Sequence, residues 1–266
     1  MNLAVFGANG KTGQLVTKQA LAAGHMVTAV TRHPETFPLR HEHLRVLYGD
    51  VSDLAAVERA VAGQDAVLST LGIPFSRKSI TIYSQGVAHI VEAMKQYSVR
   101  RLVCVSSSAT DPRTRYHDTG GGFIFEKILK PLIINSIGRT TYADMQRMEA
   151  LVMNSRLDWI IVRPSGLFET EAITDYQMVE DSIRGQFTSR ADLAACMLEQ
   201  LTTDQFLRKS VAVATFSARP KLLQFFVGEA FQRKPASVKR IGLQADQNTT
   251  TTLPEREGRS VYGKRR

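Results

Sequence analysis

With 266 residues, 43% of them hydrophobic, the chain can bury the core of one large α/β domain, which excludes a wholly disordered protein. Its formal net charge is +9, but residues 217–266 alone hold eleven Lys and Arg residues against four Asp and Glu residues. The rest of the chain is nearly balanced, so its charge does not indicate a nucleic-acid partner.

Cysteine and histidine usage indicates neither a disulfide nor a metal site. Cys104 and Cys196 are the only cysteines, and neither has a metal-ligand neighbour. The six histidines are scattered without metal-ligand spacing. The sequence starts with a strand pattern instead of a signal peptide, and no apolar run is long enough to span a bilayer. We therefore expect a cytoplasmic protein without a metal or membrane partner.

The first predicted element is a buried strand over residues 2–6, followed at once by a glycine-rich turn and a helix-period pattern. Glycine at position 7 permits a tight turn, glycine at 10 removes a Cβ where a pyrophosphate approaches, and glycine at 13 allows close helix packing. The N–H groups at the start of that helix favour an anionic ligand. A dinucleotide site is predicted at Gly7, Asn9, Gly10, Lys11, Thr12 and Gly13.

The second predicted strand covers residues 25–31 and ends at Arg32, where a dinucleotide-binding fold meets the adenosine ribose. An acidic residue at this position would bind the 2′-hydroxyl of NAD. Arg32 instead offers a planar cation that suits a 2′-phosphate. NADP(H) is therefore preferred over NAD(H), and Lys11 could supply a second cation.

The remaining pattern alternates strands with helices. Strands are expected over residues 44–48, 101–105, 158–162 and 209–214, and residues 63–72 are expected to form a strand and the turn that leaves it. Helices are expected after a cap at Asp53 or Ser52, over residues 83–97, and after a cap at Ser189. This alternation predicts an α/β fold with a Rossmann-type, doubly wound parallel sheet. We assign residues 1–216 to one domain that includes the substrate loops, and 217–266 to an amphipathic helix and a basic, flexible tail.

Ligands on such sheets bind beyond the carboxyl ends of the strands, at the point where the strand order reverses. Besides the glycine turn and Arg32, three further strand exits lie at these ends. They contribute Leu71 and Gly72, Ser106 and Ser107, and Pro164 and Ser165. We expect these separate segments to converge on one crevice.

Several ordered motifs make the chain similar to a known family. Residues 6–13, 62–67, 84–86 and 189–194 resemble the atypical, NmrA-like branch of the short-chain dehydrogenases/reductases, and in particular flavin reductases of the biliverdin reductase B type. The resemblance covers residues 2–215 and implies an NADPH-binding Rossmann domain with its substrate over the nicotinamide. It also implies that Ser107 lies near the nicotinamide, although Gly166 replaces the histidine that this family carries after the sixth strand.

The superfamily resemblance implies one more cofactor contact, and a departure from the superfamily pattern puts the catalytic role of Tyr142 in doubt. Asp50 and Val51 match an adenine contact, with a plain turn before a helix as the alternative. Ordinary short-chain reductases pair a serine with Tyr-x-x-x-Lys, but Tyr142 is followed by Gln146 at the lysine position. Because glutamine carries no charge, it cannot lower the pKa of a phenol. Tyr142 is thus either a second catalytic residue beside Ser107 or only a helix residue.

These features favour an NADPH-dependent reductase that transfers hydride to a flavin, quinone or related conjugated acceptor, because such acceptors demand little from the protein. The alternative is a non-catalytic, NmrA-like NAD(P)-sensing regulator that acts through a protein partner. An epimerase or isomerase ranks last without the Tyr/Lys pair.

The sequence is compatible with more than one structure for two segments. Residues 111–139 form either a lid with a glycine hinge or a core helix interrupted at Pro131. Residues 221–227 predict an amphipathic helix that could cover a core edge, a pocket or a second subunit, and the tail beyond is either solvated or a contact for an anionic surface. The oligomeric state is not indicated.

Overall fold

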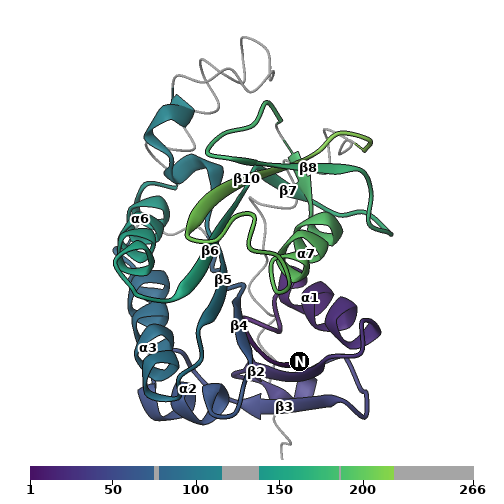
Figure 1. Cartoon of the computed structure of the whole chain (residues 1–266), viewed down its shortest axis with the longest axis vertical. Coiled ribbons are helices and arrows are strands. Elements are labelled where there is room, and N and C mark those ends of the chain that lie inside the picture. The colour runs from purple at the N-terminus through teal and green to yellow at the C-terminus, as the bar shows by residue number, and fades with distance from the viewer. Residues whose placement is uncertain (75–77, 116–137, 186, 219–266) are drawn as a thin grey trace, which may run out of the picture. The chain divides into compact units, whose positions relative to one another are not determined.

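An eight-stranded sheet organises the computed structural model, which describes residues 1–74, 78–115, 138–185 and 187–218 (Figure 1). In spatial order the strands are β3 (Leu44–Tyr48), β2 (Met26–Thr31), β1 (Asn2–Phe6), β4 (Ala66–Ser69), β5 (Arg101–Val105), β6 (Asp158–Pro164), β10 (Lys209–Thr215) and β8 (Tyr176–Glu180). All neighbours pair in parallel except β8, which is antiparallel to β10. The predicted Rossmann-type, doubly wound parallel sheet is therefore confirmed, with β8 added as an antiparallel edge strand.

Helices cover both faces of the sheet, as the doubly wound class requires (Figure 1). α1 (Lys11–Ala22) and α7 (Arg190–Glu199) lie on one face, and α2 (Leu54–Val61), α3 (Ile82–Gln96) and α6 (Arg139–Met153) lie on the other. Successive residues of a strand point to opposite faces of the sheet and pack into two separate hydrophobic cores. Leu3 therefore packs toward α1, while Ala4 packs toward α3. Because both faces are buried, the central strands read as continuous apolar runs.

The strand order reverses between β1 and β4, which pair side by side from Leu3 opposite Ala66 to Phe6 opposite Ser69. In an open α/β sheet the crevice at this reversal is the usual ligand position. The segments that follow β1, β2, β4, β5 and β6 all leave the sheet at the same carboxyl edge, because these strands are parallel. This shared edge brings together the strand exits that the sequence singled out.

Helix starts were predicted well where the capping residue is local. The Asp53 side chain accepts the Ala56 N–H at 3.3 Å and begins α2, which decides between Asp53 and Ser52. The Ser189 side chain likewise accepts the Asp192 N–H at 3.0 Å and begins α7. α3 begins differently, because the buried Asp144 of α6 accepts its Tyr83 N–H at 2.9 Å. Local patterns could not show that long-range cap.

Smaller elements complete the described chain. β7 (Gly166–Phe168) and β9 (Phe187–Ser189) form a two-stranded parallel sheet, and η1 (Pro34–Thr36), η2 (Ser108–Thr110) and η3 (Pro112–Arg115) are short 3-10 helices. Most of the proposed lid over residues 111–139, the helix over 221–227 and the basic tail lie outside the described residues. Within the described ranges, no helix combines the length and apolarity needed to cross a membrane.

Candidate functional site

The glycine turn after β1 is shaped by close contact with the exit of β4. Gly7 has φ +75°, and a Cβ on it would lie 2.6 Å from the Thr70 carbonyl oxygen. A Cβ on Gly13 would lie 2.2 Å from the Gly7 carbonyl oxygen. The Thr70 hydroxyl donates to the carbonyl oxygens of Phe6 at 2.9 Å and Gly7 at 3.2 Å. The chain's own packing therefore requires glycine at positions 7 and 13.

Gly10 is different, because little in the described chain requires a glycine there. An added Cβ would meet only the Gly7 carbonyl oxygen, at 3.3 Å, among described atoms beyond its chain neighbours. Gly10 precedes α1, whose start has no side-chain cap and no acidic residue in its first turn. The first N–H groups of a helix have no partner within the helix. The turn thus offers open space and N–H donors to an anionic group.

Charged side chains flank this turn from the β7 and α7 side. Lys11 forms an ion pair with Glu169, the residue after β7, and its ammonium group lowers the pKa of that carboxyl. Arg190, at the start of α7, donates from Nη1 to the Thr12 hydroxyl at 3.1 Å. Lys11 was predicted as a site residue, whereas Glu169 and Arg190 were not. Their positions depend on how β7 and α7 pack beside α1.

Arg32 and Asp50 meet at the ends of β2 and β3. The Arg32 Nη1 lies 3.9 Å from the Asp50 carboxylate, and the Arg32 side chain is 66% exposed. The Asp50 carboxylate accepts the Ser52 N–H at 2.9 Å and its hydroxyl at 2.8 Å. These hydrogen bonds, with a smaller contribution from Arg32, lower the pKa of Asp50 against the opposing effect of burial. Asp50 therefore shapes the turn before α2 while its charge stays beside Arg32.

Val51, Leu71 and Gly86 pack together between the β3 and β4 exits. A Cβ on Gly86 of α3 would lie 2.8 Å from Val51 Cγ2 and 3.3 Å from Leu71 Cδ1. The Val51 carbonyl oxygen lies 2.7 Å from the His89 ring nitrogen Nδ1. Gly72 has open space, since its nearest neighbour would be the Thr70 carbonyl oxygen at 4.0 Å. Glycine at position 86 therefore lets α3 approach the crevice.

The exits of β5 and β6 contain the predicted serines. The Ser106 N–H donates to the Val162 carbonyl at 2.8 Å, and its buried hydroxyl has no hydrogen-bond partner among the described residues. The Ser107 hydroxyl accepts the Ala109 N–H at 3.2 Å and begins η2, so its own proton remains available to a ligand. Ser165, next to Pro164, donates its hydroxyl to the Gly185 carbonyl at 2.8 Å.

α6 supplies Tyr142 and its neighbours. Tyr142 is half-buried against the core between α3 and α6. Gln146, at the lysine position, donates from Nε2 to the Thr110 carbonyl at 2.9 Å. Arg147 donates to the Asp144 carboxylate and the Ile80 carbonyl, both at 3.0 Å, on the α3 side. These side chains are therefore engaged in joining α6 to its neighbours.

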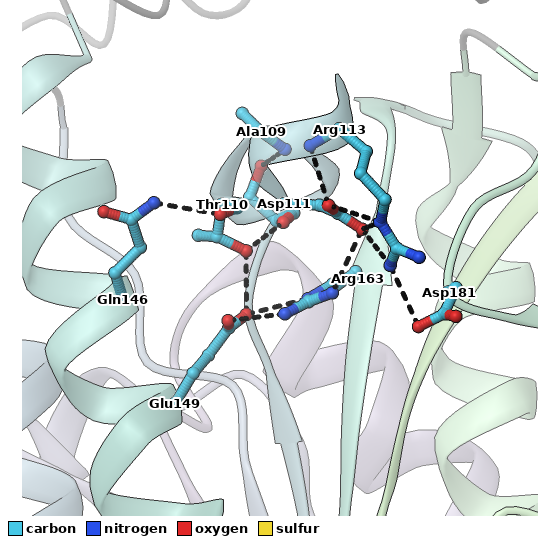
Figure 2. Close-up of polar contacts among 9 residues, drawn as sticks. Ala109, Thr110, Asp111, Arg113, Gln146, Glu149, Arg163 and Asp181 are labelled. Atoms are coloured by element: carbon cyan, nitrogen blue, oxygen red, sulfur yellow. Dashed lines mark hydrogen bonds and ion pairs between the residues drawn. The ribbon is translucent and has the colours of Figure 1, made fainter. Parts of the chain in front are cut away.

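A buried charged network contacts Thr110 and Asp111, in and just after the η2 turn (Figure 2). The Arg163 guanidinium donates to both carboxylate oxygens of Glu149, at 3.0 and 2.7 Å, and to Asp111 at 3.4 Å. The Thr110 hydroxyl lies 2.8 Å from the same Glu149 carboxylate. Sequence analysis missed this network. The sequence feature that could have indicated it is a charged residue at a position predicted to be buried. Glu149 lies on the buried side of α6, and Arg163 lies at the end of the buried strand β6.

Groups of three or more His, Cys, Asp or Glu side chains that could hold a metal ion are absent from the part of the chain that the structure describes.

Comparisons with known proteins agree with this geometry. A family model described as NAD(P)H-binding matches residues 7–204. The protein YwnB of Bacillus subtilis is 23% identical over 213 residues, which cover 76% of this chain and 92% of YwnB. A uronate dehydrogenase from Pseudomonas syringae is 30% identical over 109 residues, but these cover only 40% of this chain and 39% of the dehydrogenase.

Among solved structures, a wide-type short-chain dehydrogenase/reductase from Veillonella parvula in complex with NADP has a TM-score of 0.66. The two chains are 19% identical, and the match covers 81% of this chain and 95% of the other. At this identity the match shows a shared fold.

Proposed function

The chain belongs to the NAD(P)H-binding family, whose model matches residues 7–204, and from that premise we propose that it is an atypical short-chain dehydrogenase/reductase, acting as an NADPH-dependent reductase of a flavin, quinone or related conjugated acceptor. Residues 1–216 would form the catalytic domain. The cytoplasm is the proposed compartment, supported by Cys104 and Cys196, which are buried free thiols.

Features of the turn after β1 support a bound dinucleotide. A Cβ at Gly10 would project where the described chain leaves room, and the uncapped start of α1 supplies N–H donors for a pyrophosphate. Arg32 supports NADP(H) over NAD(H), because its exposed guanidinium stands at the strand end that meets the adenosine ribose. Asp50 and Val51 would receive the adenine, and Leu71, Gly72, Pro164 and Ser165 would line the nicotinamide end.

The observation that carries the proposed acceptor class is the position of Gln146. Its amide donates to the Thr110 carbonyl, so the place of the catalytic lysine holds an uncharged side chain that is already engaged. The lysine that lowers the pKa of the phenol in ordinary short-chain reductases is thus replaced here by glutamine. Reduction of a ketone needs such a proton donor, whereas a conjugated acceptor takes hydride with little help.

In this proposal the protein contributes position. The bound nicotinamide supplies the hydride. The turn at Gly10 fixes the phosphate end, and the buried Ser106 hydroxyl offers a donor at the end of β5. Ser107 retains a hydroxyl proton with which it can orient the acceptor or the carboxamide.

The test follows NADPH absorbance with FMN, FAD, menadione and a dichlorophenol dye, with NADH in parallel. We expect turnover with NADPH that falls about tenfold or more in Ser107→Ala, while the neighbouring Ser108→Ala stays near wild type. Tight NADPH binding without turnover on any acceptor would contradict the reductase and favour the NAD(P)-sensing regulator.

Cofactor preference has its own test. Arg32→Ala should weaken NADPH binding about tenfold, as expected for a lost phosphate contact, and leave NADH binding unchanged. Arg45→Ala, on the exposed side of β3, is the matched control. Equal weakening of both cofactors in Arg32→Ala would count against the 2′-phosphate role.

A further inference from the structure

Glu149 joins three segments that are distant in the sequence. It lies on α6 with only 4% of its surface exposed, and it accepts two hydrogen bonds from Arg163 at the end of β6. The same carboxylate lies 2.8 Å from the hydroxyl of Thr110, in the η2 turn that follows β5 (Figure 2). One side chain thus ties α6 to the exits of β5 and β6.

Stability alone gives a weak reason for this arrangement. Removing a carboxylate and a guanidinium from water costs several kcal/mol for each ion, roughly as much as their mutual attraction returns. Well-packed apolar residues of similar volume often give equal or greater stability. What the charged pair adds is directionality, because its hydrogen bonds permit only one relative placement of Arg163 and Glu149.

The contacts of Thr110 lead directly to Ser107. The Thr110 hydroxyl lies 2.7 Å from the Ser107 carbonyl oxygen, and the Thr110 N–H donates to that carbonyl at 3.1 Å. On its other side, the Thr110 carbonyl accepts the Gln146 amide at 2.9 Å (Figure 2). The turn that begins at Ser107 is therefore held by α6 at the carbonyl of Thr110, while the single hydroxyl proton of Thr110 is shared between the Glu149 carboxylate and the Ser107 carbonyl.

A second arm extends the same network. Asp111, next to Thr110, is 3% exposed and lies between two guanidinium groups, Arg163 at 3.4 Å and Arg113 at 2.7 Å. Arg113 also pairs with Asp181 at 2.9 Å, just after β8. The η2 turn is consequently anchored to α6 on one side and to the sheet edge on the other.

We infer that Glu149 and Gln146 are positioning residues, which hold the Ser107 turn through Thr110 so that the Ser107 hydroxyl keeps one orientation at the carboxyl end of β5. The helix position where ordinary short-chain reductases carry a catalytic lysine here supports the loop that carries the serine. This role rests on the proposed reductase function, because Ser107 is its orienting residue.

The experiment varies the two α6 contacts with Thr110. Thr110→Val removes the hydroxyl and keeps the volume, and Thr110→Ser restores the hydroxyl. Gln146→Met removes the amide donor. One hydrogen bond corresponds to about a threefold to tenfold effect, so kcat should fall by that factor in Thr110→Val and Gln146→Met. It should recover in Thr110→Ser, with the NADPH Kd unchanged throughout.

Thr17→Val is the matched control for a buried threonine. Thr17 is fully buried on α1, and its hydroxyl has no hydrogen-bond partner among the described residues. This variant should keep the wild-type kcat. Unchanged kcat in Thr110→Val, an equal loss in Thr17→Val, or no recovery in Thr110→Ser would each overturn the positioning role.

A readout without turnover separates this inference from the proposed function. Hydrogen exchange should quicken about threefold or more at the Ala109, Thr110 and Asp111 amides in Thr110→Val, but not in Thr110→Ser or Thr17→Val. If the wild type reduces no acceptor, the reductase proposal fails. The hydrogen-exchange rates of these amides still test whether the contacts of Thr110 stabilise the turn. Wild-type exchange at these amides in Thr110→Val would overturn the inference even if the reductase is active.

Discussion

Two turns at the carboxyl edge of the sheet, a glycine end after β1 and a charged end after β5 and β6, are built by different physical means. At the glycine end, Gly7, Gly13 and Thr70 form the turn through backbone contacts and the absence of side chains. At the β5 and β6 end, the turn is held by buried charged side chains, chiefly Glu149 and Arg163. The first end depends on sterics over a few residues, and the second on pairs formed between distant segments. Substitutions should therefore fail in different ways at the two ends.

The largest expected effect is at the charged end. Glu149→Ala leaves Arg163 buried without its carboxylate partner and should lower the free energy of unfolding by about 3–5 kcal/mol. Urea denaturation measures this loss. Glu92→Ala, an exposed glutamate on α3, should change stability by less than about 0.5 kcal/mol. Similar losses in both variants would show that the Glu149 pair is not a distinctive support.

At the glycine end, two substitutions should separate folding from binding. Gly13→Ala places a Cβ against the turn backbone and should cost about 1–3 kcal/mol of stability. Gly10→Ala meets little of the described chain, so it should keep most stability and weaken NADPH binding about tenfold or more. Urea denaturation and NADPH fluorescence titration measure the pair. Wild-type NADPH binding in a folded Gly10→Ala variant would contradict the site.

Acid should affect the charged end more than the glycine end. Burial alone raises the pKa of Asp111, but hydrogen bonds from Arg113 and the charges of Arg113 and Arg163 outweigh it, and the net pKa lies below the ordinary value. The ionised carboxylate therefore stabilises the fold above about pH 4, the usual aspartate range, and this contribution is lost as pH falls through the lowered value.

Unfolding free energies measured from pH 7 to pH 3 test this difference. Asp111→Asn should flatten the acid-side loss of stability. Glu169→Gln should change it less, because the Glu169 side chain is 62% exposed and water screens its pair with Lys11. An equal change in slope for both variants would remove the distinction between the two ends.

The smallest expected effect is the reactivity of the native thiols. Cys104 packs on the α3 and α6 face, and Cys196 on the α1 and α7 face. Burial raises the pKa of both thiols, so neither should react with iodoacetamide at pH 8 in the native state. Mass spectrometry along a urea series should show both labelled over one transition. Early labelling of Cys104 alone would indicate that the charged end opens separately.

The sequence alone determined the elements that depend on local rules. The predicted strands over residues 44–48 and 101–105 match β3 and β5, and the predicted caps Asp53 and Ser189 are confirmed. Periodicity, capping and glycine requirements act within a few residues, so they are readable along the chain. The converging strand exits followed from the parallel order.

Only the tertiary structure decided which distant side chains meet. It paired Glu149 with Arg163, set Asp144 against the start of α3, and placed β8 antiparallel at the sheet edge. A buried charge in a sequence does not name its partner, because that partner is selected by packing between elements many residues apart. The steric demands of the glycine turn were therefore predictable in detail, whereas the contacts of the Ser107 turn with α6 became visible only in the tertiary structure.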